Sequence, residues 1–594
     1  MVLHRKPKEQ TISLAMADTV DYIFYGGAIL TMDDDCPNPE AIGLKGKTIH
    51  TVGTKDHVFS FTGPQTKYVI LNGSQTLLPG LIEPHQHPTH MIEPRCSFVS
   101  CSGYHYDSYK QIEEVIKKTV AGVDPTSGKW CVFVGWDPLI VRDLPQLNLE
   151  TLDAFSLDVP ILVISESRHD SWANRKAFEA AGIDESSADP EGGCFVRDDV
   201  TKKLTGKLLE PSAWQAFLSR ASKPTTKEIA QAVDDQWKEY ACAGFTTVAE
   251  LLHAPDQEID RAVRNKAGQT DCPIRVAIYE QISNSEDASK IKPSAICPDK
   301  NDLALNDKLW FAGVKIISDG SPRCGSCATR EPFLANEKTE KFGFLPSPTY
   351  GSLNYINEEL LHMVQQGHNR AKQIALHAHG ERAIEQVLNV YEKVIGDSPD
   401  GLDRRHRMEH LGLCEEGHMV RAAKLNLALS FFVGHLYFYG DVYSEYILGK
   451  ERTNRWAPLS LATKHKLRWT IHQDHPAFPG NPAPFANMKT AVTRTKRGAP
   501  DIAYGREYCI SIEEALRAYT INAAWQIHKE KKLGSLTVGK KADLVILSEN
   551  PLEVDPFRLE EIKVIDTYLD GRSNNISVKK EGKVDGKFVI SYAC

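Results

Sequence analysis

The stretch Leu78-Pro79-Gly80-Leu81-Ile82-Glu83-Pro84-His85-Gln86-His87 is an apolar run that stops at two histidines one residue apart. Alternate residues of an extended strand point to the same face, so a strand that ends here presents His85 and His87 to one ion. Imidazole nitrogens are common ligands of divalent metals. The stretch therefore predicts the first two ligands of a metal site.

Length and composition are those of a large globular protein. The 594 residues, 41% of them hydrophobic, exceed one ordinary domain. The 70 basic and 78 acidic side chains give a formal net charge of −8 without long blocks of one sign, which excludes a basic footprint for nucleic acid and a polybasic membrane patch. We expect a small-molecule substrate, no nucleic-acid partner and no membrane partner, and the sequence leaves a homo-oligomer open.

The cysteines and the N-terminus indicate the cellular compartment of the protein. Thirteen cysteines are scattered, and Cys324 and Cys327 form one C-x-x-C pair without a second pair at zinc-ribbon spacing. Scattered thiols are typical of a reducing compartment. The N-terminus is polar and lacks the apolar core of a signal peptide, and no segment approaches the length that spans a bilayer. We predict a cytoplasmic protein.

Strand and helix patterns alternate along the middle of the chain. Short β-rich runs broken by glycine occupy residues 21–78, and similar runs occupy residues 534–547, 565–569 and 587–592, so the two ends can share one sheet. Apolar strand candidates lie at residues 161–165, 246–250, 274–279, 314–318, 373–377, 407–410, 428–432 and 469–472, and helical patterns between or after them include residues 382–395 and 512–525. This alternation predicts an α/β protein with a parallel (β/α)8 TIM barrel at residues 79–534. Residues 95–222 are long and irregular for one barrel unit, which predicts an insertion near the barrel mouth.

Several of these strands carry a side chain that can bind metal. His377 and His410 end two strands, Asp474 follows a third, and Lys315 lies inside a fourth. Active sites of β/α barrels lie at the carboxyl ends of the strands, where such side chains converge. Each histidine alone is explained equally well as a hydrogen-bonded core residue. Their recurrence at the same position in successive units predicts a metal centre.

In order, these motifs resemble those of the amidohydrolase superfamily, in particular its long type-3 branch, which includes N-substituted formamide deformylase. Residues 79–87 resemble the opening metal motif of the family, and residues 523–544 resemble its closing segment. The interior motifs that resemble the branch are Gly135-Trp136-Asp137, His169 with Asn174, Val314-Lys315-Ile316, Asp319-Gly320-Ser321, His377-Ala378-His379-Gly380, His410 and Gln473-Asp474-His475-Pro476. The resemblance implies a metal-dependent barrel beside a composite β-sandwich formed by residues 19–78 and 535–594.

The resemblance also implies the metal-binding residues, which are His85, His87, Lys315, His377, His410 and Asp474. Lys315 stands where many members carry a lysine that is carboxylated to bridge two ions. A free ammonium has no lone pair, whereas a carbamate offers two oxygens. The alternative is that Lys315 pairs with a carboxylate beside a one-metal site. Imidazole and carboxylate donors favour Zn²⁺, as one ion or two.

Further residues are predicted around the metal. The resemblance gives Asp474 and His169 catalytic roles and gives Trp136, Asn174 and His379 contacts with the substrate. A surface or capping role explains His169 and Asn174 equally well, a core position explains Trp136, and a structural role explains His379. The chain departs from the family pattern at Gln473, Glu381, His379 and His475.

The predicted chemistry is hydrolysis. A bound metal ion lowers the pKa of water to about 7 and polarises a carbonyl, while Asp474 takes a proton from the water and returns it to the departing nitrogen. We therefore predict a hydrolase of C–N bonds other than peptide bonds that acts on an amide, formamide or cyclic amide of a small molecule. A metal-dependent decarboxylase or deaminase on the same barrel, and a catalytically silent regulator that keeps the fold, are the alternatives.

Overall fold

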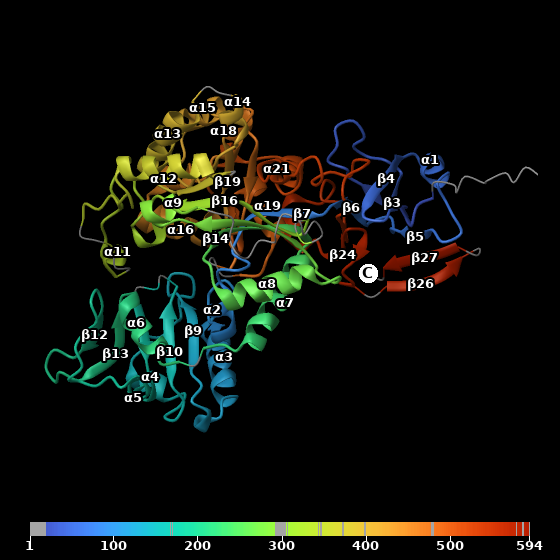
Figure 1. The fold of residues 1–594 in the computed structure, drawn as a ribbon. Helices are drawn as coiled ribbons and strands as arrows, with labels where there is room; N and C mark the ends of the chain where they lie inside the picture. Colours follow the sequence, from blue (N-terminus) through green and yellow to red (C-terminus); the bar gives the residue numbers. More distant parts are fainter. Residues whose placement is uncertain are drawn as a thin grey trace, which may run out of the picture.

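The structure, a computed structural model, describes residues 19–594 except 167, 169, 222, 292–304, 306, 342–343, 345–346, 371–372, 397–398, 477–479, 578, 585–586 and 593–594. A central barrel, an inserted α/β unit and a β-sandwich make up the described chain. In Figure 1 the inserted unit lies below the barrel and the sandwich lies to its right.

Eight parallel strands form the central sheet. They are β7 (Leu81–Gln86), β14 (Phe245–His253), β15 (Arg275–Gln281), β16 (Leu309–Ile317), β17 (Ile374–Ala378), β18 (Arg407–His410), β19 (Ala428–Phe431) and β20 (Trp469–Ile471). At the seam between β20 and β7, the His87 N–H donates to the His475 carbonyl at 2.8 Å, and the His85 and His472 rings stack with their centroids 4.4 Å apart. The predicted (β/α)8 barrel is confirmed.

Amphipathic helices surround the barrel. In α13 (Glu381–Ile395) the buried side chains include Ala383, Ile384, Val387, Leu388 and Tyr391, a spacing that forms one apolar stripe. The other helices from residue 226 onward are α7 (Thr226–Cys242), α8 (Gln257–Gly268), α9 (Ser285–Ser289), α11 (Glu337–Lys341), α12 (Asn357–Arg370), α14 (Pro399–Asp403), α15 (Glu416–Lys424), α16 (Gly434–Val442), α17 (Lys450–Asn454), α18 (Leu459–Lys464), α19 (Pro484–Thr493), α20 (Ile512–Ala518) and α21 (Ile521–Gln526). Within the described residues, no helix has the length and apolar character needed to cross a membrane.

The helix predicted at residues 512–525 is two helices, α20 and α21. The break falls at Tyr519 and Thr520, and the Tyr519 carbonyl accepts the N–H of Ile82 in β7 at 2.7 Å. Because the Tyr519 carbonyl bonds to the barrel, the run of helical hydrogen bonds is interrupted here. The apolar periodicity of the sequence continues through the break, so it does not reveal it.

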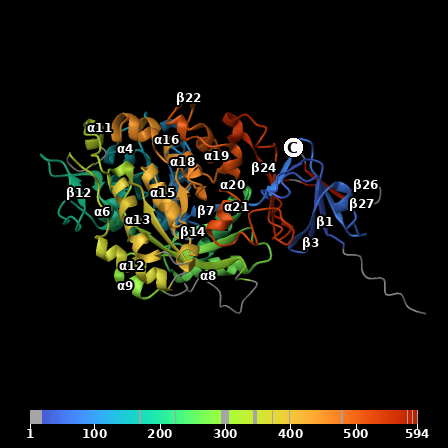
Figure 2. The ribbon, with the colours of Figure 1, turned by 90° about the horizontal axis from the view of Figure 1, so that it is seen from above.

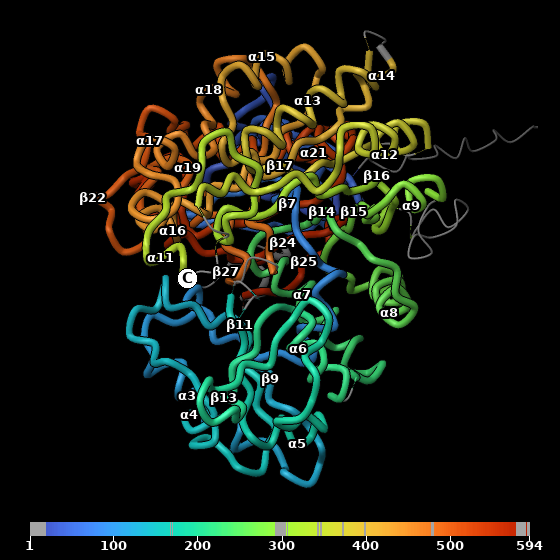
Figure 3. Tube along the Cα trace, turned by 90° about the vertical axis from the view of Figure 1, so that its left-hand side faces the viewer, coloured from blue at the N-terminus to red at the C-terminus, as the bar shows by residue number. Residues whose placement is uncertain are grey.

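A six-stranded mixed sheet forms the inserted unit, which Figure 3 shows beneath the barrel. It comprises β8 (Phe98–Ser100), β9 (Cys131–Trp136), β10 (Ile161–Ser165), β11 (Asp170–Ala173), β12 (Cys194–Arg197) and β13 (Leu204–Leu209), with helices α2 (Ile92–Ser97), α3 (Tyr109–Ala121), α4 (Leu149–Asp153), α5 (Arg175–Ala181) and α6 (Pro211–Leu218). The predicted strand at residues 161–165 is therefore β10 of the insertion and not part of the barrel. All five of its residues are buried, so its apolar run resembles that of a barrel strand.

The two ends of the chain meet in a β-sandwich. One sheet contains β1 (Tyr22–Tyr25), β3 (Ala41–Lys45), β4 (Thr48–Gly53), β5 (Lys67–Ile70), β26 (Lys579–Val584) and β27 (Lys587–Tyr592), and the other contains β2 (Ala28–Ile29), β6 (Thr76–Pro79), β23 (Leu544–Leu547), β24 (Val564–Leu569) and β25 (Arg572–Ser573). β27 pairs with β5, and β23 pairs with β6. Figure 2 shows blue and red strands together at one end of the molecule. We infer one domain from residues 19–78 and 535–594 and a second from residues 79–534.

Candidate metal centre

The ends of β7 and β20 bring three predicted ligands together. His85 Nε2 lies 3.1 Å from Asp474 Oδ1, and His87 Nε2 lies 2.9 Å from the same oxygen. Both imidazoles are buried, and the Asp474 side chain is 18% exposed. Asp474 has a φ of +60°, a left-handed conformation that is rare for residues with a side chain and is often found at functional sites. We call His85, His87 and Asp474 the Asp474 group.

Two buried glutamates hold the outer nitrogens of the Asp474 group. His85 Nδ1 lies 2.7 Å from Glu409, and His87 Nδ1 lies 3.2 Å from Glu250. Arg407 donates to both oxygens of Glu409, at 2.7 and 3.0 Å. Because each Nδ1 is occupied, each Nε2 is left to face Asp474.

The ends of β17 and β18 bring three more histidines together. The ring centroid of His410 lies 4.3 Å from that of His377 and 4.7 Å from that of His379. Asp319 accepts the backbone N–H groups of His379 and Gly380 at 3.0 and 2.9 Å, which fixes the turn after β17. We call His377, His379 and His410 the His410 group.

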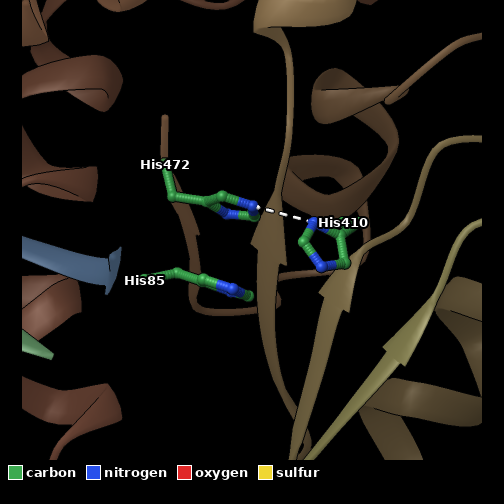
Figure 4. A group of neighbouring side chains, drawn as sticks. All are labelled: His85, His410 and His472. Atoms are coloured by element: carbon green, nitrogen blue, oxygen red, sulfur yellow. Dashed lines mark hydrogen bonds between the residues drawn. The ribbon is translucent and has the colours of Figure 1, made fainter. Parts of the chain in front are cut away.

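A further histidine, His472, lies between the two groups. Its ring stacks on that of His85, and its Nε2 lies 3.2 Å from Nδ1 of His410. Figure 4 marks the contact between His472 and His410 with a dashed line. Its Nδ1 lies 2.8 Å from the Ser430 hydroxyl. Potential ligand atoms of His85, His410 and His472 lie within 4.8 Å of one another, as do those of the Asp474 group and of the His410 group.

Burial and hydrogen bonding set the charges in the cluster. Burial alone would lower the pKa of His87, but hydrogen bonds to Asp474 and Glu250 raise it to about 9. Burial alone would raise the pKa of Asp474, but hydrogen bonds from His85 and His87 hold it well below its usual range. Burial lowers the pKa values of His379, His410 and His472 well below the usual imidazole range, so these three rings are neutral.

Lys315 lies in β16 and is buried beside the cluster. Burial lowers its pKa to about 8, although Glu409 and Asp474 favour the charged form. Its Nζ has no hydrogen-bond partner among the described residues. Burying an ammonium without a hydrogen-bond partner costs free energy. The position therefore favours chemical modification of this amine or contact with a bound ligand.

The residues fit a divalent cation. Ligands of a tetrahedral zinc ion at about 2.1 Å lie about 3.4 Å from one another, and the two contacts to Asp474 Oδ1, at 3.1 and 2.9 Å, are within about 0.5 Å of that spacing. Nδ1 of His379 is buried without a hydrogen-bond partner among the described residues, which leaves a donor atom available in the His410 group. The neutral imidazoles and the ionised Asp474 are the donor types that Zn²⁺ prefers.

Three other predicted residues lie apart from this cluster or outside the described chain. Trp136, at the end of β9, lines a cavity of about 200 Å³ together with Arg323. Asn174 caps α5, where its oxygen accepts the N–H of Ala177 and of Ile161, each at 2.9 Å. These contacts support the capping role, and contact of Asn174 with the substrate stays a prediction. His169 lies outside the described residues.

Glu250, Glu409 and His472 are cluster residues that the sequence analysis did not select. Glu250 and His472 end predicted strands, so the rule that selected His377 and His410 would also have found them. Glu409 directly precedes His410, and strict alternation along a strand would turn its side chain away. His410 has a φ of +73°, so the regular strand ends there and both side chains reach the cluster.

Two cavities lie between the insertion and the barrel mouth. One, of about 240 Å³, is lined by Phe98 and Glu166 of the insertion and by His475. The other, of about 310 Å³, also borders His475 and includes Gln473. Asp474 stands between Gln473 and His475, so both cavities lie beside the loop that carries this carboxylate.

Known proteins resemble the chain along most of its length. The type-3 family profile described as "Amidohydrolase family" matches residues 73–573. N-substituted formamide deformylase of Arthrobacter pascens is 26% identical over 571 residues, which cover 94% of this chain and 98% of that protein. Protein LONG AFTER FAR-RED 3 of Arabidopsis thaliana is 27% identical over 566 residues, which cover 93% and 91%.

A solved structure shares the fold. An uncharacterized metal-dependent hydrolase from Pyrococcus horikoshii OT3 superposes with a TM-score of 0.66 at 20% identity, and the match covers 90% of this chain and 99% of that one. The family profile extends from the last strand of the N-terminal half of the sandwich, through the whole barrel, to β25. The chain belongs to the amidohydrolase family.

Proposed function

We propose that the protein is a metal-dependent hydrolase of C–N bonds other than peptide bonds, with an amide, formamide or cyclic amide of a small molecule as substrate. One observation carries the proposal: the Asp474 group and the His410 group, whose members are far apart in the sequence, come together at the carboxyl ends of barrel strands. The relative named N-substituted formamide deformylase supports this class of bond.

The Asp474 group and the His410 group would hold the cation or cations, and their donors suit Zn²⁺. A divalent cation bound there supplies a Lewis acid that polarises a carbonyl and lowers the pKa of bound water to about 7. Glu409 and Glu250 keep Nε2 of His85 and His87 turned inward, so the ligands are oriented before any cation binds.

Asp474 is the proposed general base and general acid. Its carboxylate is ionised at neutral pH because His85 and His87 stabilise the charged form. It can accept a proton at Oδ1 or Oδ2 from the attacking water and return it to the departing nitrogen. An amine leaves poorly as an anion, so the second transfer is as necessary as the first.

Lys315 is proposed to be carboxylated. Its lowered pKa, about 8, leaves part of the amine neutral at physiological pH. Only the neutral amine can attack CO₂, and the reaction forms an N–C bond and releases one proton. The resulting carbamate carries a negative charge and two oxygens, which suits a position beside cations better than an ammonium does.

The substrate is proposed to enter between the insertion and the barrel. The cavities of about 240 and 310 Å³ beside the Asp474 loop can hold a small organic molecule but not a folded protein. Trp136 and His379 remain proposed substrate contacts, and His169 remains a proposed catalytic residue.

Metal analysis coupled to a substrate panel tests the proposal. Purified protein is assayed for bound zinc, and the reconstituted enzyme is offered N-formyl, N-acyl and lactam compounds, with amine, ammonia and CO₂ as readouts. Release of an amine from an amide supports the proposal. Ammonia from an amino-substituted ring favours a deaminase, and CO₂ favours a decarboxylase. A protein that binds no metal under any condition favours a silent regulator.

A further inference from the structure

The cavity of about 240 Å³ has one wall from the barrel and one from the insertion. Met91 and His475 line its barrel side, and they stand shortly after His87 and directly after Asp474 in the chain. Residues at the ends of β8, β9 and β10 line its insertion side. A molecule in this cavity therefore lies beside the two chain segments that continue from the Asp474 group.

Four acidic or arginine side chains line the cavity, and three of them are engaged in ion pairs. Arg95 pairs with Glu239, and Glu166 accepts from Arg323 at 3.1 Å. The fourth, Arg168, forms no ion pair with any carboxylate in the described part of the chain. The cavity therefore contains one guanidinium whose charge is not paired by direct contact.

The structure holds the backbone of Arg168 and leaves its side chain accessible. Trp214, another residue of the cavity wall, donates its Nε1–H to the Arg168 carbonyl at 3.0 Å. The Arg168 side chain is exposed, so a ligand in the cavity can reach it. The oxygens of Glu166 accept from Arg323 and from the Ser102 hydroxyl, at 3.1 and 3.4 Å, so this carboxylate is already occupied. A guanidinium stays charged at every physiological pH, and an anionic group is its natural ligand.

Much of the remaining wall is apolar. The apolar lining residues are Met91, Pro94, Phe98, Val134, Ile164 and Pro476. The neighbouring cavity of about 310 Å³ also borders His475, and Arg497 is the one acidic or arginine side chain among its described lining residues. Arg497 pairs with Asp107 at 2.8 Å, so the unpaired charge lies at the Arg168 end of the two cavities.

We propose that the substrate is an amide that carries a carboxylate on an apolar body, and that Arg168 is the specificity-determining residue that binds this carboxylate. This inference rests on the proposed function and names the substrate class of the same site. A guanidinium can donate two parallel N–H groups to the two oxygens of a carboxylate, which fixes both position and direction. The apolar body then lies against the apolar wall, and the amide is directed toward Asp474.

The same arrangement excludes an ammonium group at this end of the substrate. Arg168 would repel a cation, and the two carboxylates of the cavity, Glu166 and Glu239, are already paired. A neutral polar group would gain only an ordinary hydrogen bond from the guanidinium, whereas a hydrogen bond between charged groups contributes more. The expected preference is therefore for the anionic compound.

Matched pairs of formamides test the inference. N-formylphenylalanine and N-formylphenethylamine differ only by the carboxylate, and so do N-formylleucine and N-formyl-3-methylbutylamine. Amine release by the metal-loaded enzyme is measured for each compound, with both enantiomers of the amino acid derivatives. We expect kcat/KM to be about 10- to 100-fold higher for the carboxylate-bearing member of each pair, mainly through a lower KM.

Substitution of Arg168 should remove this preference. Arg168→Met keeps much of the side-chain length without the charge, and the ratio of kcat/KM within each pair should fall to about 1. Arg168→Lys keeps the charge but loses the planar fork, so it should give an intermediate ratio. Arg220→Met is the matched control, because Arg220 is an exposed arginine of the insertion that borders neither cavity, and it should keep the wild-type ratio.

Calorimetric binding of the same compounds separates this inference from the proposed function, and thermal unfolding checks that each variant folds. Carboxylate-dependent binding that Arg168→Met abolishes, without hydrolysis of any amide, would refute the proposed function and leave this inference standing. Hydrolysis with equal or reversed kcat/KM within the pairs would overturn the inference and support the proposed function. A carboxylate preference that persists in Arg168→Met, or no binding of any of these compounds, would also overturn the inference.

Discussion

At the scale of single residues, two buried carboxylates determine how the first pair of histidines is oriented. Glu409 and Glu250 accept from Nδ1 of His85 and His87, and Asp474 lies between the two Nε2 atoms. The apolar run before His85 has the pattern of a strand, and a strand that ends there turns His85 and His87 to the same face. The sequence therefore predicts that these two histidines act together. Glu250 ends a predicted strand, as His377 does, but Glu409 stands one residue before His410, where strict alternation would turn its side chain away.

Asp474→Asn tests the proton-transfer role. Asparagine keeps the size of the side chain but cannot accept a proton, so we expect kcat for amide hydrolysis to fall about 10²- to 10⁴-fold at saturating metal. Asp501→Asn, which changes an exposed carboxylate, serves as the control and should leave kcat unchanged. Undiminished hydrolysis by Asp474→Asn would rule out the mechanism.

The affinity for metal should rise with pH. His87 has a pKa of about 9 without a cation and is protonated at neutral pH, so a cation must displace this proton to reach Nε2. The apparent affinity should therefore fall as pH falls below about 9, by up to about tenfold per unit for one proton released. Calorimetry in buffers of different protonation enthalpy measures the released proton. An affinity that does not change between about pH 6.5 and 8.5 contradicts this account.

At the scale of elements, the strands were easier to predict than their assignment to a sheet. The apolar run at residues 161–165 is a strand as expected, but it pairs with β9 and β11 of the insertion. Its continuous apolar sequence indicates a strand that is buried on both faces, and strands of a barrel have the same pattern. The helix at residues 512–525 is interrupted because Tyr519 accepts a hydrogen bond from β7, a contact between residues more than 400 positions apart.

Asn174 provides a prediction for one helix. Its side chain accepts from Ala177 and Ile161 and donates to the carbonyls of Ser156 and Val159. Asn174→Ala leaves these buried groups without partners, and we expect a loss of about 2–4 kcal/mol in the free energy of unfolding. Denaturant unfolding measures this loss. Normal stability with a raised KM would instead indicate that Asn174 contacts the substrate.

At the scale of the whole molecule, one arginine joins the barrel to the sandwich. Arg275 of β15 is buried, donates to both oxygens of Asp543 at 2.8 and 3.1 Å, and also pairs with Asp570 and Asp307. The sequence predicted that the two chain ends share a sheet, because both have short β-rich runs. It could not predict this ion pair, since charge alone does not identify its partner.

Arg275→Met should destabilise the protein without changing the donors of the cluster. Methionine fills much of the volume but leaves the buried Asp543 without its arginine partner, whereas Asp570 keeps Lys541 at 3.4 Å. Breaking one side of a buried ion pair costs about 3–5 kcal/mol. Denaturant unfolding should show this loss, while metal content per folded molecule stays at the wild-type value. A variant as stable as the wild type would show that the pair does not hold the two domains together.

Anomalous diffraction at the zinc absorption edge, from crystals grown with Zn²⁺, tests the central claim most directly. The account predicts a peak at about 2.0–2.2 Å from Nε2 of His85, Nε2 of His87 and an oxygen of Asp474. Where the protein binds two cations, the second peak is predicted in the His410 group. Crystals that show no anomalous peak among these side chains, or zinc bound only elsewhere, would contradict it.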